Sequence, residues 1–506
     1  MTGAGAVTRR AGGGREAIAV GTLTLGAAVI RVPTLGVQSF WLDEGYTERL
    51  LRMSFGGMLH AIPQTESTPP VYYALAWVWV RLFGHSEFGL RSLSALAGIL
   101  TVPVAYALAR RLAGPRAAVI AGLLVAVSPL LIWFSQEARA YALATLLGTL
   151  SVLCLVAWRQ EGGWRWAAGW GLAAALGLAT HYFVAFVVAG ELALLWWRPD
   201  AARRGRAVAT AAVAATAVAL IPLALAQRGT GHADYIAQGS LATRVIQVPK
   251  QLLVGYASPH QLITALVGAL LILGGALWPL ARGGPAARQA RVPLAIGLTA
   301  VLAPVGLALV GIDFLDTRNL LPALPVLYVA AAIGLAAWRA PVGAALTGTL
   351  AVLCLVVVGA VEADARYQRV DWRDAGAAAG SAVGPKAIVV SPGSGLIPLQ
   401  VYLPRLRTLS GAATVRELDV IAVGAQVTGG GIGTPPRLSA PLPVPAGFRL
   451  VRAVAASTYT VLRYRSAAPV TVTPASLAGV HLGQTGSLAL LEPAAAGKPG
   501  SSPQTP

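Results

Sequence analysis

Charged side chains are scarce in this sequence of 506 residues. Asp, Glu, Lys and Arg together make up 12% of the chain, whereas hydrophobic residues make up 56%. An ordinary globular domain carries about 25% charged residues, so the composition excludes a soluble globule of the usual kind. The sequence instead predicts a polytopic α-helical membrane protein.

Cysteine is also nearly absent. Cys154 and Cys354 each lie inside an apolar run, far apart in the sequence. This excludes a disulfide framework and favours a packing role for both residues. A small-residue cleavage site is missing after the first apolar run as well, which indicates an uncleaved first span.

Acidic residues are the third scarcity. The chain has 20 Asp and Glu against 39 Lys and Arg, a net charge of +19. Such an excess could indicate nucleic-acid binding, but the arginines gather in the loops between alternate apolar runs, as cytoplasmic loops do. The basic excess therefore predicts topology, and no nucleic acid is expected as a partner.

The apolar runs predict eleven transmembrane helices, each of about 20 residues. Two of them form a hairpin within 164–197, because a turn near His181 keeps the flanking arginines on one side. The N-terminus is then cytoplasmic and the C-terminus exterior, in the cell (plasma) membrane. The other spans are expected at 17–36, 92–109, 117–134, 141–158, 207–226, 262–281, 292–310, 320–338 and 341–361.

Residues 71–83 are apolar but too short to span. A helix of this length reaches roughly 20 Å, against a hydrocarbon thickness of about 30 Å. Its tyrosines and tryptophans are typical of the membrane interface, and Pro69-Pro70 directly before it favours a helix start. We expect a juxtamembrane helix within a first exterior loop at 37–91.

Polar residues gather on the predicted exterior side. Asp43 and Glu44 directly follow the first span, where carboxylates are costly unless they have a function or face water. Simple solvation of loops is the alternative reading for most of these residues. The gathering favours an active site at the outer membrane surface, lined by Glu137, Tyr46, Tyr72, His181 and Tyr182.

We expect Asp43 to be the catalytic base. Glu44 is either its partner in catalysis, a metal ligand or only a solvated neighbour. Arg139 and Arg318 are best placed to bind a phosphate at the membrane surface, because a guanidinium offers a planar bidentate fork. Lys250 is a weaker candidate for the same role.

Three further assignments stay open. Arg244 is another weak candidate for a phosphate ligand. Glu137 and Arg139 are equally consistent with an interfacial ion pair, and His181, in a short hairpin, with a structural residue.

Several motifs between residues 17 and 375 belong together. They are Phe40–Tyr46, the Pro-Pro-Val-Tyr-Tyr run at 69–73, Gly84–Arg91, Ser128-Pro129, Ser135–Tyr141, Arg318–Pro322 and Asp371–Asp374. As a set they resemble the GT-C superfamily of membrane glycosyltransferases, in the family 39-like bacterial branch related to protein O-mannosyltransferases and lipid A aminoarabinose transferases. One departure is Thr68, where many relatives carry His before the Pro-Pro pair.

The resemblance implies a GT-C-like catalytic domain at 1–361 and a polyprenyl-phosphate sugar donor. The expected reaction moves a sugar, mannose or similar, to a hydroxyl of a glycan, glycolipid or protein acceptor, with inversion. No cofactor is assigned, and Asp43 and Glu44 leave a divalent cation open, because they could supply oxygen ligands. The alternative is a transporter or flippase of lipid-linked sugars, for which the expected internal repeats are not visible.

The chain beyond residue 361 has an ordinary soluble composition. We expect a small exterior α/β domain at 362–469, with helices at 371–379 and 396–403, a strand at 387–390 and a β pair within 448–464. Residues 470–506 are rich in Pro, Ala, Ser and Gly and are expected to be a flexible tail.

Overall fold

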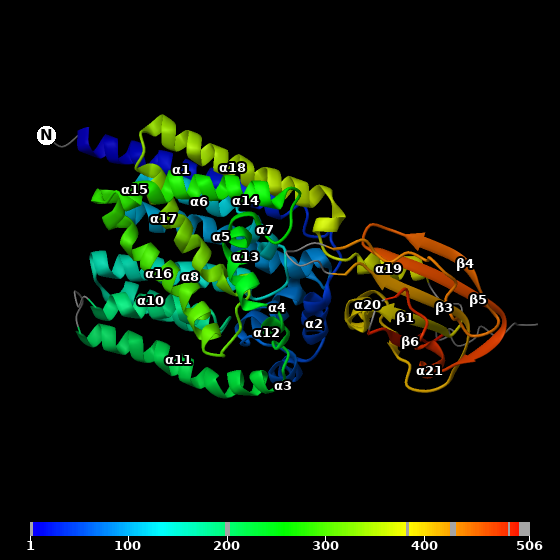
Figure 1. The fold of residues 1–506 in the computed structure, drawn as a ribbon. Coiled ribbons are helices and arrows are strands. Elements are labelled where there is room, and N and C mark those ends of the chain that lie inside the picture. The colour runs from blue at the N-terminus through cyan, green and yellow to red at the C-terminus, as the bar shows by residue number, and fades with distance from the viewer. Residues whose placement is uncertain (1–3, 198–202, 381–383, 426–431, 484–485, 495–506) are drawn as a thin grey trace, which may run out of the picture. The chain divides into compact units, whose positions relative to one another are not determined.

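The computed structural model describes residues 4–197, 203–380, 384–425, 432–483 and 486–494 (Figure 1). The chain divides into two compact units. The first, the helical unit, comprises Met1–Val37 and Leu50–Val361. The second, the sheet unit, comprises Gln38–Arg49 and Glu362–Pro506. Arg198, predicted to be cytoplasmic, and the end of the predicted tail, 495–506, lie outside the described residues.

The segment Gln38–Arg49 differs from expectation, because the sequence placed it in the same domain as the spans. Its backbone is tied to the sheet unit: the Phe40 N–H donates to the Tyr402 hydroxyl at 2.7 Å. The Ser39 hydroxyl donates to the Val370 carbonyl at 3.0 Å and accepts from the Trp372 N–H at 2.9 Å. These contacts join residues more than 300 positions apart, which local sequence patterns do not reveal.

The helical unit consists of helices. Helix α2 is divided between the two units, because residues 42–49 belong to the sheet unit and residues 50–51 to the helical unit. The α-helices before residue 200 are α1 (Ala4–Arg31), α2 (Leu42–Leu51), α3 (Phe55–Thr65), α4 (Val71–Phe83), α5 (Glu87–Ala113), α6 (Pro115–Val127), α7 (Pro129–Ser135), α8 (Tyr141–Glu161), α9 (Trp164–Leu178) and α10 (Val184–Trp197). Those after it are α11 (Arg203–Gly229), α12 (Tyr235–Gln238), α13 (Leu241–Val254), α14 (Gln261–Leu270), α15 (Trp278–Ala281), α16 (Gly284–Leu309), α17 (Leu324–Ala336) and α18 (Ala340–Ala363). The π-helix η1 (Leu271–Leu277) joins α14 to α15, and the 3-10 helix η2 (Thr317–Ala323) leads into α17.

The described chain supports fewer spans than the eleven predicted. Seven helical stretches are long and apolar enough to cross a membrane, and the bent pair α6–α7 would make an eighth. The expected hairpin forms, but α9 and α10 have only 15 and 14 residues, each about 22 Å or less at 1.5 Å per residue. The protein is thus a polytopic helical membrane protein with seven or eight candidate spans.

Helix α4 occupies the predicted residues, Val71–Phe83. It begins after Pro70 and ends before Gly84, whose φ of 81° suits glycine and stops the helix. The Trp77 indole N–H donates to the Met53 carbonyl at 3.0 Å, and the Trp79 indole N–H to the Ser92 hydroxyl at 2.8 Å. These aromatic residues therefore fasten α4 to the segments on either side of it in sequence.

The sheet unit contains one six-stranded mixed sheet with the order β2-β6-β1-β3-β5-β4. Strand β1 is parallel to β3, and the other pairings are antiparallel. Helices α19 and α20 lie against one face of the sheet (Figure 1). Trp372 and Leu399 are buried in the core on that face. The elements are α19 (Trp372–Ala379), β1 (Lys386–Ser391), α20 (Leu396–Tyr402), β2 (Arg407–Thr408), β3 (Ala413–Val423), β4 (Phe448–Ala455), β5 (Tyr459–Val472), α21 (Pro474–Leu477) and β6 (Leu488–Glu492), with 3-10 turns η3 (Ala365–Tyr367) and η4 (Gly393–Gly395).

The predicted tail at 470–506 begins too early. Strand β5 continues to Val472, and β6 pairs with both β1 and β2. Residues 488–492 read Leu-Ala-Leu-Leu-Glu, and all of them are buried or half-buried in the sheet. A composition rich in Ala and Pro around this short run concealed the strand.

Candidate active site

The carboxylates expected to be catalytic lie on α2. Asp43 and Glu44 occupy its first turn, where the partial positive charge of a helix N-terminus favours acidic residues. Asp43 is half-buried and Glu44 is fully buried. Tyr46 follows on the same helix and is half-buried. All three predicted residues lie within Gln38–Arg49 and therefore belong to the sheet unit.

The other predicted site residues lie in the helical unit, where Arg139 forms a buried ion pair. Its Nη1 lies 2.8 Å from Oε2 of Glu66, and the two side chains are 10% and 1% exposed. The Tyr73 hydroxyl donates to the same Glu66 oxygen at 2.5 Å and lies 3.0 Å from the Thr68 hydroxyl. Burial, the largest cause, raises the pKa of Tyr73, so its hydroxyl stays a donor.

Glu66 is a site residue that the sequence reasoning missed. It precedes the Thr-Pro-Pro turn and caps the C-terminus of α3, which ends at Thr65. The signal was a lone carboxylate between two apolar helices in a chain poor in acids. The fold tolerates its burial because a guanidinium and a phenol share its charge.

Arg318 lies in η2, two residues after Asp316. Its Nε is 3.2 Å from Oδ2 of Asp316, and the Tyr256 hydroxyl donates to the other oxygen of that carboxylate at 3.0 Å. The guanidinium carbon lies 5.9 Å from the ring centroid of Tyr141 and 5.8 Å from that of Tyr235. Both distances lie within cation–π range.

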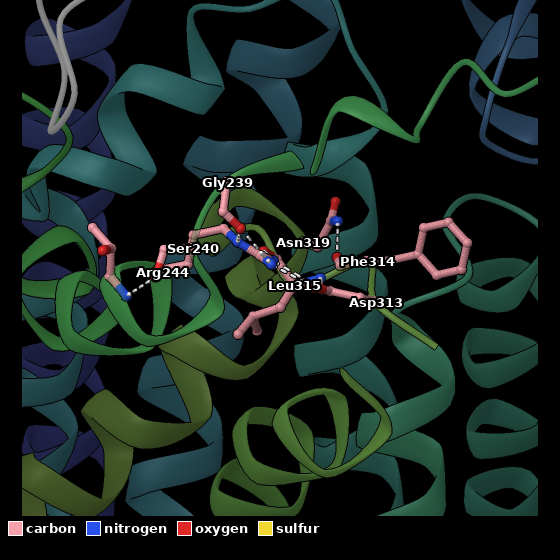
Figure 2. A network of polar contacts seen from close by, with 8 residues as sticks. Gly239, Ser240, Arg244, Asp313, Phe314, Leu315 and Asn319 are labelled. Carbon is pink, nitrogen blue, oxygen red and sulfur yellow. Dashed lines mark hydrogen bonds and ion pairs between the residues drawn. The ribbon is translucent and has the colours of Figure 1, made fainter. Parts of the chain in front are cut away.

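Arg244 proves to be a structural clamp, shown in Figure 2. Its Nη1 donates to Oδ1 of Asp313 and to the Leu315 carbonyl, both at 2.8 Å, and Nη2 pairs with the second Asp313 oxygen. Its Nε and Nη2 also donate to the Gly239 carbonyl at 3.3 and 3.2 Å. These contacts hold the loop before η2 against the start of α13, so Arg244 is committed to protein partners.

Lys250, the predicted weaker phosphate ligand, lies on α13 and also contacts protein groups. Its Nζ donates to the Tyr256 carbonyl at 2.8 Å and to the Gln261 side-chain oxygen at 2.9 Å. Burial lowers its pKa. Lys250 therefore supports the segment that carries Tyr256, which in turn contacts Asp316.

His181 and Tyr182 form the turn between α9 and α10. The His181 ring centroid lies 5.3 Å from that of Tyr141, and its Nδ1 accepts from the Phe183 N–H at 3.2 Å. Burial, followed by the charges of Arg139 and Arg318, lowers the pKa of His181 to about 3. The imidazole is thus neutral at physiological pH and cannot supply a proton as a cation.

Tyr182 fastens this turn to the loop that carries Glu66. Its hydroxyl donates to the Gln227 side-chain oxygen at 2.7 Å, and the Gln227 amide donates to the Thr68 carbonyl at 3.0 Å. The Val71 N–H donates to the Ala179 carbonyl at 3.1 Å. Burial raises the pKa of Tyr182 to about 12, so it remains a hydrogen-bond donor.

Tyr72 and Glu137 complete the predicted set. The Tyr72 hydroxyl lies 3.4 Å from that of Ser94, which donates to the Arg139 carbonyl at 3.3 Å. Glu137 is buried, and its carbonyl accepts from the Arg139 N–H at 2.8 Å, which tightens the turn between α7 and α8. The structure therefore brings together Arg139, Tyr72, Glu137 and His181. The His181 ring and the Arg318 guanidinium both lie beside the ring of Tyr141.

Three or more His, Cys, Asp or Glu side chains placed to hold a metal ion are not found within the described ranges. What the helical unit does assemble is two largely buried guanidinium groups beside aromatic rings. Such an arrangement is suited to binding an anion whose apolar portion lies among helices.

Residues 67–225 match the family of dolichyl-phosphate-mannose-protein mannosyltransferases. This match contains Tyr72, Arg139, Tyr141, His181 and Tyr182, and it confirms the predicted resemblance. No curated protein matches the sequence.

The solved structures that are similar to this chain include three membrane enzymes. ArnT from Cupriavidus metallidurans bound to undecaprenyl phosphate is 18% identical, with a TM-score of 0.45, over 63% of this chain and 60% of that one. The oligosaccharyltransferase AglB from Archaeoglobus fulgidus is 15% identical, with a TM-score of 0.48, over 72% and 57%. The Pmt1-Pmt2 complex of S. cerevisiae is 17% identical, with a TM-score of 0.33, over 42% and 32%. The alignments thus span less than two thirds of each relative.

Proposed function

We propose that this protein is a membrane glycosyltransferase that moves a sugar, mannose or similar, from a polyprenyl phosphate to a hydroxyl acceptor. The observation that carries the proposal is the buried cationic cluster around Arg139 and Tyr141, within the segment that matches the mannosyltransferase family. An anionic lipid head group is the ligand class that such a cluster in an apolar helical protein suits best.

In this proposal Arg139 and Arg318 bind the donor phosphate. Both guanidinium groups already contact carboxylates, Glu66 and Asp316, which hold them in place before the donor arrives. As the bond between the sugar C1 and the phosphate oxygen breaks, negative charge grows on the phosphate. Fixed cations stabilise that charge without a strong general acid.

Asp43 acts as the base in the same scheme. It accepts the proton of the acceptor hydroxyl as that oxygen forms its bond to the sugar C1, and the polyprenyl phosphate leaves. Glu44 supports it from the next position on α2. Tyr46, Tyr72, Glu137, His181 and Tyr182 line the site, with Lys250 as a supporting residue.

The proposal includes the orientation that the arginine pattern predicts. It places the N-terminus in the cytoplasm and the sheet unit outside the plasma membrane, where it contributes to acceptor binding. The eleven-span arrangement also belongs to this proposal. It requires α9 and α10 to cross the membrane as two short spans joined by a turn. A glycan, a glycolipid and a protein are the acceptor classes to be tested.

The test is sugar transfer by membranes incubated with a panel of radiolabelled polyprenyl-phosphate sugars. Asp43→Asn and Arg318→Ala should each reduce transfer at least about 100-fold while insertion is unchanged. Glu161→Gln, which changes an exposed carboxylate at the end of α8, is the matched control and should keep normal activity. Normal transfer by Asp43→Asn would refute its assignment, and labelled lipid that crosses the bilayer without transfer would favour a flippase.

A further inference from the structure

Arg31, the last residue of α1, is a fully buried cation, and its hydrogen bonds go to neutral groups. Its Nη1 donates to the Ala126 carbonyl at 2.7 Å, and its Nη2 to the Val125 carbonyl at 3.1 Å. Its Nε donates to the Ser135 hydroxyl at 3.2 Å. One guanidinium therefore reaches both the end of α6 and the end of α7.

The helix break between α6 and α7 explains the first two contacts. Pro129 has no N–H, so the Val125 carbonyl lacks the donor that an unbroken helix would supply four residues later. The two helices are bent by 57° at Ser128, and Arg31 supplies donors to the carbonyls at 125 and 126. Without these donors, buried carbonyls would be unsatisfied in an apolar environment.

A second set of contacts fixes the other end of α7. The Gln136 side-chain amide donates to the Arg31 carbonyl at 3.1 Å and to the Thr34 hydroxyl at 2.6 Å. Gly98 of α5 leaves room for this arrangement, because a Cβ at that position would overlap the Ser135 hydroxyl. The loop that begins at Gln136 carries Arg139.

We propose that Arg31 is a positioning residue for Arg139. It fixes the tilt of α7 at both ends and so places the 136–140 loop where Arg139 can bind a lipid phosphate. This inference rests on the proposed phosphate-binding role of Arg139. Arginine suits the task because its planar fork directs several donors at fixed angles, whereas lysine directs its donors from a single nitrogen.

Arg116 provides a matched control. It too is an arginine that donates to backbone carbonyls: Nη1 donates to Trp338 at 2.7 Å, and Nη2 to Arg339 and Ala340 at 3.2 and 3.3 Å. It joins the start of α6 to the turn between α17 and α18, away from the break after Val127. A loss of carbonyl capping alone should therefore affect both arginines alike.

The experiment compares Arg31→Met, Arg31→Lys, Arg116→Met and Arg139→Ala in the full-length protein in lipid nanodiscs. The readouts are binding of undecaprenyl phosphate, the KM and kcat for the sugar donor, and amide hydrogen exchange at 128–140. We expect Arg31→Met to speed exchange there and to raise the donor KM roughly tenfold or more, since small misplacements of binding groups are costly. Arg31→Lys should fall in between, and Arg116→Met should keep the wild-type KM.

Several outcomes would decide the matter. Wild-type KM and wild-type exchange in Arg31→Met would overturn the inference, as would an equal rise in KM in Arg116→Met. Loss of undecaprenyl phosphate binding in Arg139→Ala but not in Arg31→Met would overturn it too. A further outcome is faster amide exchange at 128–140 in Arg31→Met, with undecaprenyl phosphate binding unchanged in both Arg31→Met and Arg139→Ala. It would refute the phosphate-binding proposal and support only the role of Arg31 in fixing α7. If Arg31→Met does not fold, Ser135→Ala removes the Nε acceptor, together with the bond that this hydroxyl donates to the Leu131 carbonyl, and should still raise the KM.

Discussion

Oε2 of Glu66 lies 2.8 Å from Nη1 of Arg139, and both side chains are almost wholly buried. The two residues are 73 positions apart and come from the loop after α3 and the turn before α8. The anionic ligand that we propose for Arg139 would therefore approach a guanidinium that one carboxylate already orients. The pair also links the juxtamembrane segment to the helical bundle.

Removing one partner of this pair should be costly. Glu66→Ala is expected to lower the stability of the helical unit by about 3 kcal/mol, because it leaves a buried cation without its carboxylate. The double variant Glu66→Ala/Arg139→Met should lose less than the sum of the single changes. Thermal unfolding in nanodiscs gives the double-mutant cycle, and strict additivity would show that the pair contributes no coupling.

His181 should make stability fall in mildly acidic solution. Its pKa of about 3 in the fold lies below the ordinary value near 6.5, so the unfolded chain binds the additional proton between these pH values. Stability is therefore lost as pH falls below about 6.5, by up to about 1.4 kcal/mol per pH unit. His181→Phe should flatten unfolding profiles between pH 7 and 5, whereas the exposed control His232→Phe should not.

The Arg244 clamp should weaken in more acidic solution. The hydrogen bond from Arg244 holds the pKa of Asp313 below its usual range. The stabilisation is therefore complete above the unfolded pKa of about 3.9 and is lost as pH falls through the lower folded value. Hydrogen exchange in residues 310–318 should rise below about pH 4 in the wild type. Asp313→Asn should show faster exchange already at pH 7, and equal exchange at both pH values in the two proteins would contradict the role of the clamp.

A row of alternating charge crosses four strands of the sheet unit. Lys386 on β1 is fully buried, with its Nζ 3.1 Å from Oδ2 of Asp419 on β3 and 3.2 Å from Oε2 of Glu492 on β6. Arg463 on β5 continues the row, 3.2 Å from the other Asp419 oxygen. The carboxylates therefore lie on both sides of the lysine.

Lys386→Met should destabilise the sheet unit by about 3–5 kcal/mol, because two buried carboxylates then lose their shared cation. The matched control is Arg465 on β5, which pairs with Glu417 but has a side chain that is 56% exposed. Arg465→Met should cost less than about 1 kcal/mol. Amide hydrogen exchange of β1 and β3 would separate the two variants, and equal losses would show that burial of the row is unimportant.

The sequence predicted best what local signals encode. Both ends of α4 were predicted correctly, because Pro69-Pro70 precedes the helix and Gly84 follows it. Helix α19 and strand β1 were predicted from short periodic runs. Glu66 and Arg31 were missed as site residues because their partners lie far along the chain, at Arg139 and Ser135. Strand β6 was missed for the same reason, since its pairing with β1 joins segments about a hundred residues apart.

The lengths of α9 and α10 mark a different limit. The length of the apolar run and its flanking arginines predicted two crossings within 164–197 with a turn near His181. The chain does turn there, and the turn leaves 15 and 14 residues for α9 and α10. Tertiary contacts hold that turn, among them the hydrogen bond from Tyr182 to Gln227. A hydropathy profile contains no information about such contacts and therefore cannot predict the lengths of α9 and α10.

Strand β6 lies between β1 and β2, in the interior of the sheet. Until residues 488–492 have been synthesised, one edge of β1 has no neighbour, and the buried Lys386 lacks Glu492. Unpaired apolar strand edges are templates for association between chains. The sheet unit must therefore complete its folding after its other strands have left the ribosome, and a chain that stops before residue 488 would expose the edge that β6 covers.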